Sequence, residues 1–165
     1  MDIQNKILTR GGDFIVRETN CEEIFTPEDF NDEQKMMREA VKEFADKEIW
    51  SKKHEFEKHN YELTEKVMEK AGNLGFLGVG VPEEYGGLGM PLTSSVLVCD
   101  YFSGSSGSTS TAFGAHTGIG TMPILLYGNE EQKKKYIPKL ATGEHIGAYC
   151  LTEPSAGSDA NNGKT

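Results

Sequence analysis

Apolar side chains recur about every three or four positions along much of this chain, which is typical of amphipathic helices packed around a shared core. In the segment that begins at residue 31, for example, one face carries Met37, Ala40, Val41 and Phe44, while charged residues fill the other face. The pattern predicts helices over the following residues: 31–52, 62–74, 93–102, 108–127 and 130–140. The fold class is therefore predicted to be mainly α.

The residues at the predicted helix ends support these boundaries. Asn31 or Asp32 can cap the first helix, and Gly75 suits the left-handed position that follows the second. Asn129 and Gln132 have the spacing of a capping box, in which each side chain accepts from the other residue's backbone N–H. We therefore expect the last helix to begin directly after Asn129.

Other segments do not fit a long helix. Residues 1–30 are expected to form an extended arm with apolar side chains that pack onto a larger body, namely Phe14, Ile15, Val16, Ile24, Phe25 and Phe30. Residues 75–91 are rich in glycine and interrupted by proline, which excludes a long regular element. Their apolar side chains predict a loop fixed onto the core: Phe76, Leu77, Val79, Val81, Tyr85 and Leu88.

The helix predicted over 108–127 is unusually rich in small residues. Gly114, Gly118 and Gly120 fall inside it, and each interior glycine costs about 1 kcal/mol relative to alanine. We expect such a helix to be approached closely by a neighbouring part of the chain or by a ligand. His116 lies on the same helix and is expected to be a packed or half-exposed side chain rather than a catalytic base.

Composition narrows the classes of partner and compartment. A net charge of −9 argues against nucleic acid, which needs a basic face. No apolar run reaches the ~20 residues of a membrane-spanning helix, and the N-terminus resembles neither a signal nor a transit peptide. The three cysteines lack C-x-x-C spacing and suggest free thiols. We expect a cytoplasmic protein, or one of the mitochondrial matrix if it is eukaryotic, without an integral membrane segment.

Several familiar chemistries are excluded by spacing. His54 and His59 are poorly spaced for one helical face, and no cysteine or carboxylate cluster completes a metal site, so no metal is expected. The tail from Gly157 to Thr165 has one residue too many before Gly-Lys-Thr to be a phosphate loop. The serines near Gly104 lack the spacing of a nucleophile elbow.

The stretch 146–159 is the strongest candidate site. Residues 146–151 are predicted to form a strand, which breaks into a turn of small and hydroxyl residues, Thr152–Asp159. Ser155, Gly157 and Ser158 carry no bulk, so a flat or phosphorylated ligand can approach the backbone closely.

Four stretches resemble the N-terminal part of the acyl-CoA dehydrogenase family, in the family's order: 75–90, 116–128, 129–144 and 148–160. The last, AYCLTEPSAGSDA, is the most specific. Family members have an N-terminal helical domain, a middle β domain and a C-terminal helical bundle. The resemblance implies an arm over 1–30, the helical domain over 31–144, and the truncated start of the β domain, with its first strand, over 145–165.

The resemblance also implies FAD as cofactor and acyl-CoA as substrate. The cofactor-binding residues that it implies are Tyr149, Leu151, Thr152, Gly157 and Ser158. The substrate-contacting residues that it implies are Ser158, Gly114, Ala115 and Gly118. Backbone donors aimed at the isoalloxazine would stabilise the charge that arrives with a hydride.

The implied reaction is α,β-dehydrogenation of fatty acyl-CoA in β-oxidation, with electrons passed to electron-transfer flavoprotein. The family's glutamate base belongs to the C-terminal bundle, so no catalytic residue is assigned here, and this chain alone is expected to be inactive. The arm resembles the long-chain and very-long-chain subgroup, which suggests a long-chain substrate, and the full-length protein is expected to be a homo-oligomer.

Two alternatives remain open at this stage. One is a helical interaction module that kept the family's first domain without flavin chemistry. The other is a relative of the acyl-CoA oxidases or nitroalkane oxidases, which differs in its electron acceptor.

Overall fold

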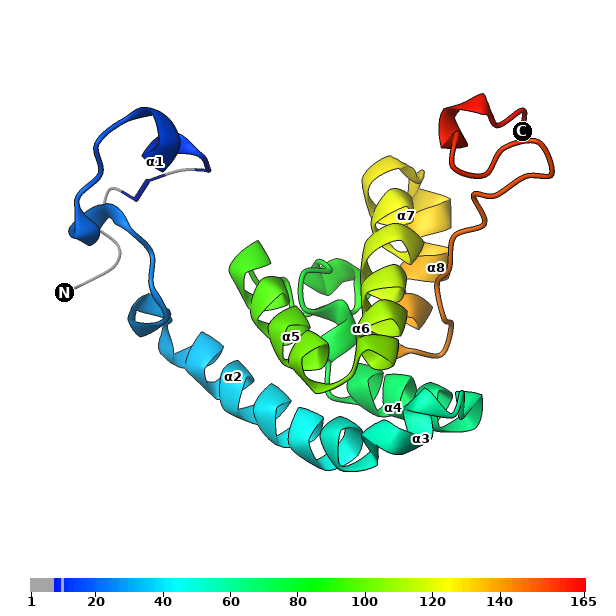
Figure 1. Ribbon diagram of the computed structural model, residues 1–165, viewed down its shortest axis with the longest axis horizontal. Coiled ribbons are helices and arrows are strands. Elements are labelled where there is room, and N and C mark those ends of the chain that lie inside the picture. The colour runs from blue at the N-terminus through cyan, green and yellow to red at the C-terminus, as the bar shows by residue number, and fades with distance from the viewer. Residues whose placement is uncertain (1–7, 10) are drawn as a thin grey trace. The chain divides into compact units, whose positions relative to one another are not determined.

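The computed structural model describes residues 8–9 and 11–165, and it is mainly helical, as predicted (Figure 1). The α-helices are α1 Asp13–Val16, α2 Asp32–Phe44, α3 Lys53–Glu57, α4 Tyr61–Asn73, α5 Leu92–Ser105, α6 Gly107–Gly114, α7 Met122–Tyr127 and α8 Glu130–Thr142. Segments of π-helix are η4 Ala45–Ile49 and η8 Ala115–Gly120. Short 3₁₀ turns are η2 Cys21–Glu23, η3 Pro27–Asp29, η5 Trp50–Lys52, η6 Phe76–Gly78, η7 Glu83–Tyr85 and η9 Ala160–Asn162.

The chain divides into an N-terminal unit, Met1–Met37, and a larger unit, Arg38–Thr165. In the described part of the N-terminal unit, Thr26 and Asp29 form a capping box at the start of η3. The rings of Phe25 and Phe30 lie 5.5 Å apart. Phe14, Ile15 and Val16 are exposed on α1. The packing of the arm onto a larger body therefore stays a prediction.

The core of the larger unit is organised around a row of aromatic rings. Phe44, at the end of α2, lies 5.4 Å from Phe76 and 5.7 Å from Phe102. Phe102 on α5 stacks on Phe113 of α6 at 4.2 Å. All these rings are buried, so they join α2, α5 and α6 to the glycine-rich loop.

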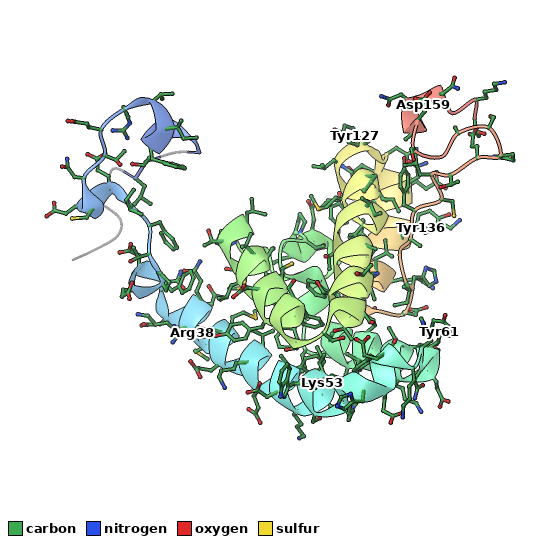
Figure 2. All side chains as sticks on the ribbon, viewed as in Figure 1. Arg38, Lys53, Tyr61, Tyr127, Tyr136 and Asp159 are labelled. Atoms are coloured by element: carbon green, nitrogen blue, oxygen red, sulfur yellow. The ribbon has the colours of Figure 1, made fainter. Side chains whose placement is uncertain are left out.

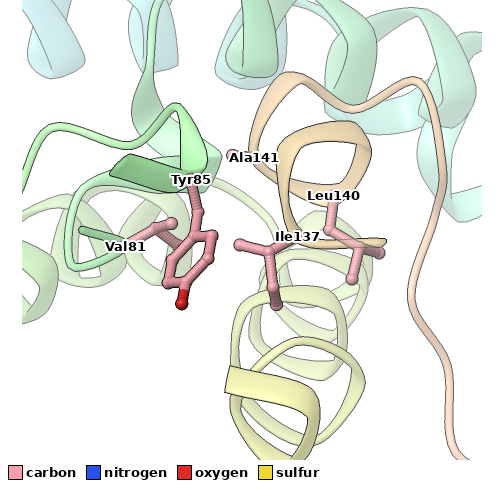
Figure 3. Close-up of a cluster of buried hydrophobic side chains, with 5 residues drawn as sticks. All are labelled: Val81, Tyr85, Ile137, Leu140 and Ala141. Carbon is pink, nitrogen blue, oxygen red and sulfur yellow. The ribbon is translucent and has the colours of Figure 1, made fainter. Parts of the chain in front are cut away.

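That loop is fixed onto the core, as predicted. Most of its apolar side chains are buried, and only Leu88 of the predicted set is exposed, at 40%. Val81 and Tyr85 pack with Ile137, Leu140 and Ala141 of α8 (Figure 3). The Tyr85 hydroxyl also donates to Glu130 Oε2 at 2.9 Å, and this bond raises the pKa of Tyr85 to about 12.

The predicted helix ends are confirmed. Asn31 and Gln34 each accept from the other's backbone N–H, at 2.8 and 3.0 Å. Asn129 and Gln132 do the same at 2.9 Å, so α8 begins at Glu130. Gly75 follows α4 with a φ of +80°, a conformation that glycine adopts without strain.

Two predicted helices are interrupted, and the prediction of unbroken helices was wrong. The helix predicted over 31–52 changes from α to π at Ala45 and to 3₁₀ at Trp50. The one predicted over 108–127 becomes a π segment, η8, between α6 and α7. Pro123 has no N–H to continue the α-helical bonding, and Thr121 Oγ1 donates to the His116 carbonyl at 2.7 Å.

The strand predicted over 146–151 is not formed, and none of the described residues belongs to a strand. After α8 the chain runs back alongside that helix in an extended path (Figure 1). A strand needs a partner for its backbone groups, and the described residues supply none here. An isolated bridge between Glu153 and Ala156 closes the following turn.

Candidate functional site

Small residues leave one side of the α6–η8 segment open. A Cβ added to Gly114 or to Gly118 would meet no atom within 4 Å, and Gly114 is exposed. Ala115, between them, is half-buried. These are the residues implied to contact substrate, and an added Cβ at either glycine would meet open space rather than a packed neighbour.

Gly120 behaves differently, because another part of the chain approaches it closely. A Cβ on Gly120 would lie 2.7 Å from the backbone of Gly147, and one on Gly147 would lie 2.9 Å from Gly120. No side chain fits between the two backbones. The expected close approach to this helix is confirmed at Gly120, and the partner is the segment that follows α8.

His116 also contacts Gly147, the residue whose backbone lies against Gly120. Its side chain has no exposed surface, as expected of a packed residue. The Gly147 N–H donates to Nδ1 at 2.9 Å, so Nε2 carries the proton and donates to the Leu140 carbonyl at 2.9 Å. Burial lowers the pKa of His116, which keeps the ring neutral in this role.

The residues implied to bind flavin lie beyond this contact and are open to a ligand. Tyr149 is 57% exposed and Leu151 47%, and Thr152, Gly157 and Ser158 are exposed as well. In the described chain, the backbone N–H groups of these residues donate no hydrogen bond. Free backbone donors beside small side chains fit a flavin ring and its phosphates.

Glu153 stabilises the turn that lies between Thr152 and Gly157. Its Oε2 accepts from the Lys164 N–H at 2.8 Å and its Oε1 from the Thr165 N–H at 3.0 Å. The Glu153 and Ala156 backbones exchange hydrogen bonds of 3.0 and 3.1 Å. The bonds to residues 164 and 165 lower the pKa of the Glu153 carboxyl, so it stays charged and acts structurally.

Two open clefts lie beside α7 and α8, and the first of them also adjoins the start of this segment. One, of about 490 Å³, is lined by residues that include Gly120, Ile124, Leu140 and Gly147. The other, of about 280 Å³, lies between α7 and α8, where Tyr127 and Tyr136 flank it (Figure 2). The contacts of residue 147 with His116 and Gly120 join the implied substrate helix to the implied flavin segment.

Sequence reasoning missed the role of His116. The residue stood out on a glycine-rich helix, but its partners lie far away in the sequence. Periodicity shows which face of a helix is apolar and carries no signal for a bond to residue 147.

Among the described residues, no group of three or more histidine, cysteine or acidic side chains is placed to hold a metal ion. The helices of residues 8–9 and 11–165 include none with the length and apolarity to cross a membrane.

Comparison with known proteins identifies relatives across nearly the whole chain. The family described as acyl-CoA dehydrogenase, N-terminal domain, matches residues 31–144. A probable acyl-CoA dehydrogenase of Bacillus subtilis is 47% identical over 156 residues, 94% of this chain and 26% of that protein. A mitochondrial isovaleryl-CoA dehydrogenase of Solanum tuberosum is 40% identical over 79% of this chain and 32% of its own length.

A solved structure shares the fold. It is an acyl-CoA dehydrogenase from Bacillus anthracis in complex with FAD, with a TM-score of 0.85 and 47% identity over 94% of this chain and 26% of that one. The chain thus spans about a quarter to a third of the length of these relatives. None of these relatives supports the long-chain and very-long-chain subgroup suggested by the arm, and one is named for isovaleryl-CoA.

Proposed function

The chain belongs to the acyl-CoA dehydrogenase N-terminal domain family, and we propose that the full-length protein is an FAD-dependent acyl-CoA dehydrogenase. The observation that carries this proposal is the match over residues 31–144 together with 47% identity to the Bacillus subtilis relative. The reaction would remove hydrogen from the α and β carbons of an acyl-CoA thioester. The base that takes the α-proton would come from outside residues 1–165.

The role of this chain in the reaction is to bind and to orient. Leu151 and Thr152 would offer backbone and hydroxyl groups to the isoalloxazine, Tyr149 would lie beside it, and Gly157 and Ser158 would lie near the flavin phosphates. When bound, FAD supplies the hydride acceptor. The exposed and unbonded N–H groups of these residues support the assignment, since they are free to pair with the cofactor.

The acyl group would lie against Gly114, Ala115 and Gly118, with Ser158 touching the CoA thioester. The open space beside Gly114 and Gly118 supports this position. It is compatible with a long acyl chain, whereas the isovaleryl-CoA relative favours a short branched one. We retain the long-chain substrate as a hypothesis to be tested by comparing turnover of palmitoyl-CoA, butyryl-CoA and isovaleryl-CoA.

The remaining proposals concern partners and compartment. Electron-transfer flavoprotein would receive the electrons, and the full-length protein would assemble with copies of itself in the cytoplasm or the mitochondrial matrix. A test of the acceptor is direct: reduction of electron-transfer flavoprotein marks a dehydrogenase, and hydrogen peroxide formed from oxygen marks an oxidase.

Cofactor binding can be tested with a matched pair of glycine substitutions in the full-length protein. An added Cβ would meet no atom within 4 Å at Gly157 or at Gly104, so we expect both Gly157→Val and Gly104→Val to fold. Only the valine at 157 would obstruct the flavin, and we expect FAD affinity to fall about tenfold or more. The FAD affinity of both variants is measured by fluorescence titration of the apoproteins.

Equal FAD affinity in the two variants would contradict the assignment of residues 157–158 to the flavin. A colourless wild-type protein that takes up no FAD would favour the alternative of a helical interaction module.

A further inference from the structure

His116 connects the helical body to the segment that leaves it. A buried imidazole must have hydrogen-bond partners, or its polar nitrogens cost free energy. One partner, the Leu140 carbonyl, belongs to α8. The other, the Gly147 N–H, lies beyond the end of α8 on the way to the residues assigned to flavin.

Gly147 is held from two directions. The His116 ring accepts its N–H, and its backbone packs against Gly120, where a Cβ on either glycine would lie within 3 Å of the other's backbone. From Ala148 to Thr152, no backbone N–H in the described chain donates a hydrogen bond. Gly147 is therefore the last tethered residue before Tyr149, Leu151 and Thr152.

We propose that His116 is a positioning residue of the flavin site: through its bond to Gly147 it fixes the point from which residues 149–158 depart. The inference rests on the proposed function, because it assigns His116 a role towards the FAD segment. A simple structural role would instead tie η8 to α8 through Leu140, and the Gly147 bond would be incidental.

The two ring nitrogens can be separated by amide substitutions. In His116→Asn, the amide oxygen lies near the place of Nδ1 and can accept from Gly147, but the side chain is too short to reach Leu140. In His116→Gln, the amide nitrogen can donate to the Leu140 carbonyl as Nε2 does, and nothing takes the place of Nδ1. Each variant therefore keeps one bond and loses the other.

The test measures FAD affinity, the flavin absorbance spectrum and the urea midpoint of both variants in the full-length protein. If His116 positions the segment, His116→Gln binds FAD about tenfold more weakly than His116→Asn and shifts the flavin bands, at similar urea midpoints. If both variants lose affinity only in proportion to their lost stability, or if the asparagine variant is the weaker binder, the inference is overturned.

A second variant covers the case in which neither substitution folds. Gly147→Ala disturbs the same contact without touching the ring, because its Cβ would meet Gly120. FAD affinity about tenfold below wild type supports the inference, and unchanged affinity overturns it.

Failure of the proposed function would be visible separately. A wild-type protein that binds no FAD refutes the flavoprotein assignment, whatever the variants do. Amide hydrogen exchange in the apoprotein then decides on the Gly147 tether: protection of the Gly147 N–H in wild type and in His116→Asn, but not in His116→Gln, supports it. Equal exchange in all of them overturns it.

Discussion

Glycines on one helical segment perform opposite roles. Gly120 has no room for a side chain, because the backbone of Gly147 lies against it. Gly114 and Gly118 have nothing near them, so their missing side chains leave a gap at the surface. The sequence shows all three only as costly interior glycines, and the structure assigns the close contact to Gly120 and the open face to Gly114 and Gly118.

Because the surroundings of Gly120 and Gly118 differ, we expect a change to alanine to affect stability differently at the two positions. Gly120→Ala should lower the free energy of unfolding by about 1–3 kcal/mol, because two backbones must separate to admit the methyl group. Gly118→Ala, the control, should leave stability unchanged or raise it by up to about 1 kcal/mol. Urea unfolding of the apoproteins measures both, and a Gly120→Ala protein as stable as the control would contradict the contact.

His116 predicts a pH dependence of stability. Burial lowers its pKa, so the unfolded chain binds the proton more readily than the folded one. Its contribution to stability is therefore present above the unfolded pKa of about 6.5 and is lost as pH falls towards the folded value.

The difference between wild type and His116→Asn isolates this contribution. We expect the wild-type unfolding free energy to fall more steeply than that of the variant as pH falls below about 6.5. Parallel curves would show that the ring takes up a proton in the fold without cost.

At the scale of elements, the sequence predicted where several helices begin or end, but it did not predict where two of them are interrupted. The capping boxes at Asn31 and Asn129 are predictable because each joins residues that are close in the sequence. The interruption at η8 coincides with Pro123 and with the bond from Thr121 to the His116 carbonyl, which helical periodicity does not reveal.

A strand over 146–151 would need a partner, and the described residues form no strand. The small and hydroxyl residues of 152–159 predicted a turn, and the family resemblance implied its flavin role, while the contact of Gly147 with His116 is visible only in the fold.

The π segment η4 is joined to α4 by one carboxylate. Glu48 Oε2 accepts from Lys52 at 2.7 Å and from Lys70 at 2.8 Å, and these bonds lower the Glu48 pKa to about 2. Because the folded pKa is depressed, the stabilisation is present above the ordinary value of 4.5 and is lost as pH falls towards 2.

Glu48→Gln should therefore reduce the unfolding free energy at neutral pH by about 1 kcal/mol, since both lysines are partly exposed. As pH falls from 4.5 towards 2, the unfolding free energies of the variant and the wild type should converge. Glu62→Gln is the control, because its pair with Lys66 lies on the exposed face of a single helix. A loss at Glu48 no larger than at Glu62 would contradict a role in joining the two elements.

At the scale of the molecule, the larger unit, Arg38–Thr165, is the part of the chain on which we propose the contacts to cofactor and substrate. The small residues of α6 and η8, the tether at Gly147 and the unbonded donors beyond it follow one another in space. In the proposed function they would make up only part of a site, since no base for the α-proton is assigned among them. This agrees with the comparisons, in which the matched part of the chain covers 26% of one relative and 32% of the other.

The central claim is tested most directly by an anaerobic absorbance scan of the full-length protein, before and after mixing with palmitoyl-CoA, butyryl-CoA or isovaleryl-CoA. The account predicts flavin bands that bleach with at least one of these thioesters, and the one that bleaches fastest identifies the acyl chain. A protein that cannot be reconstituted with FAD, or a flavin that none of the thioesters reduces, would contradict it.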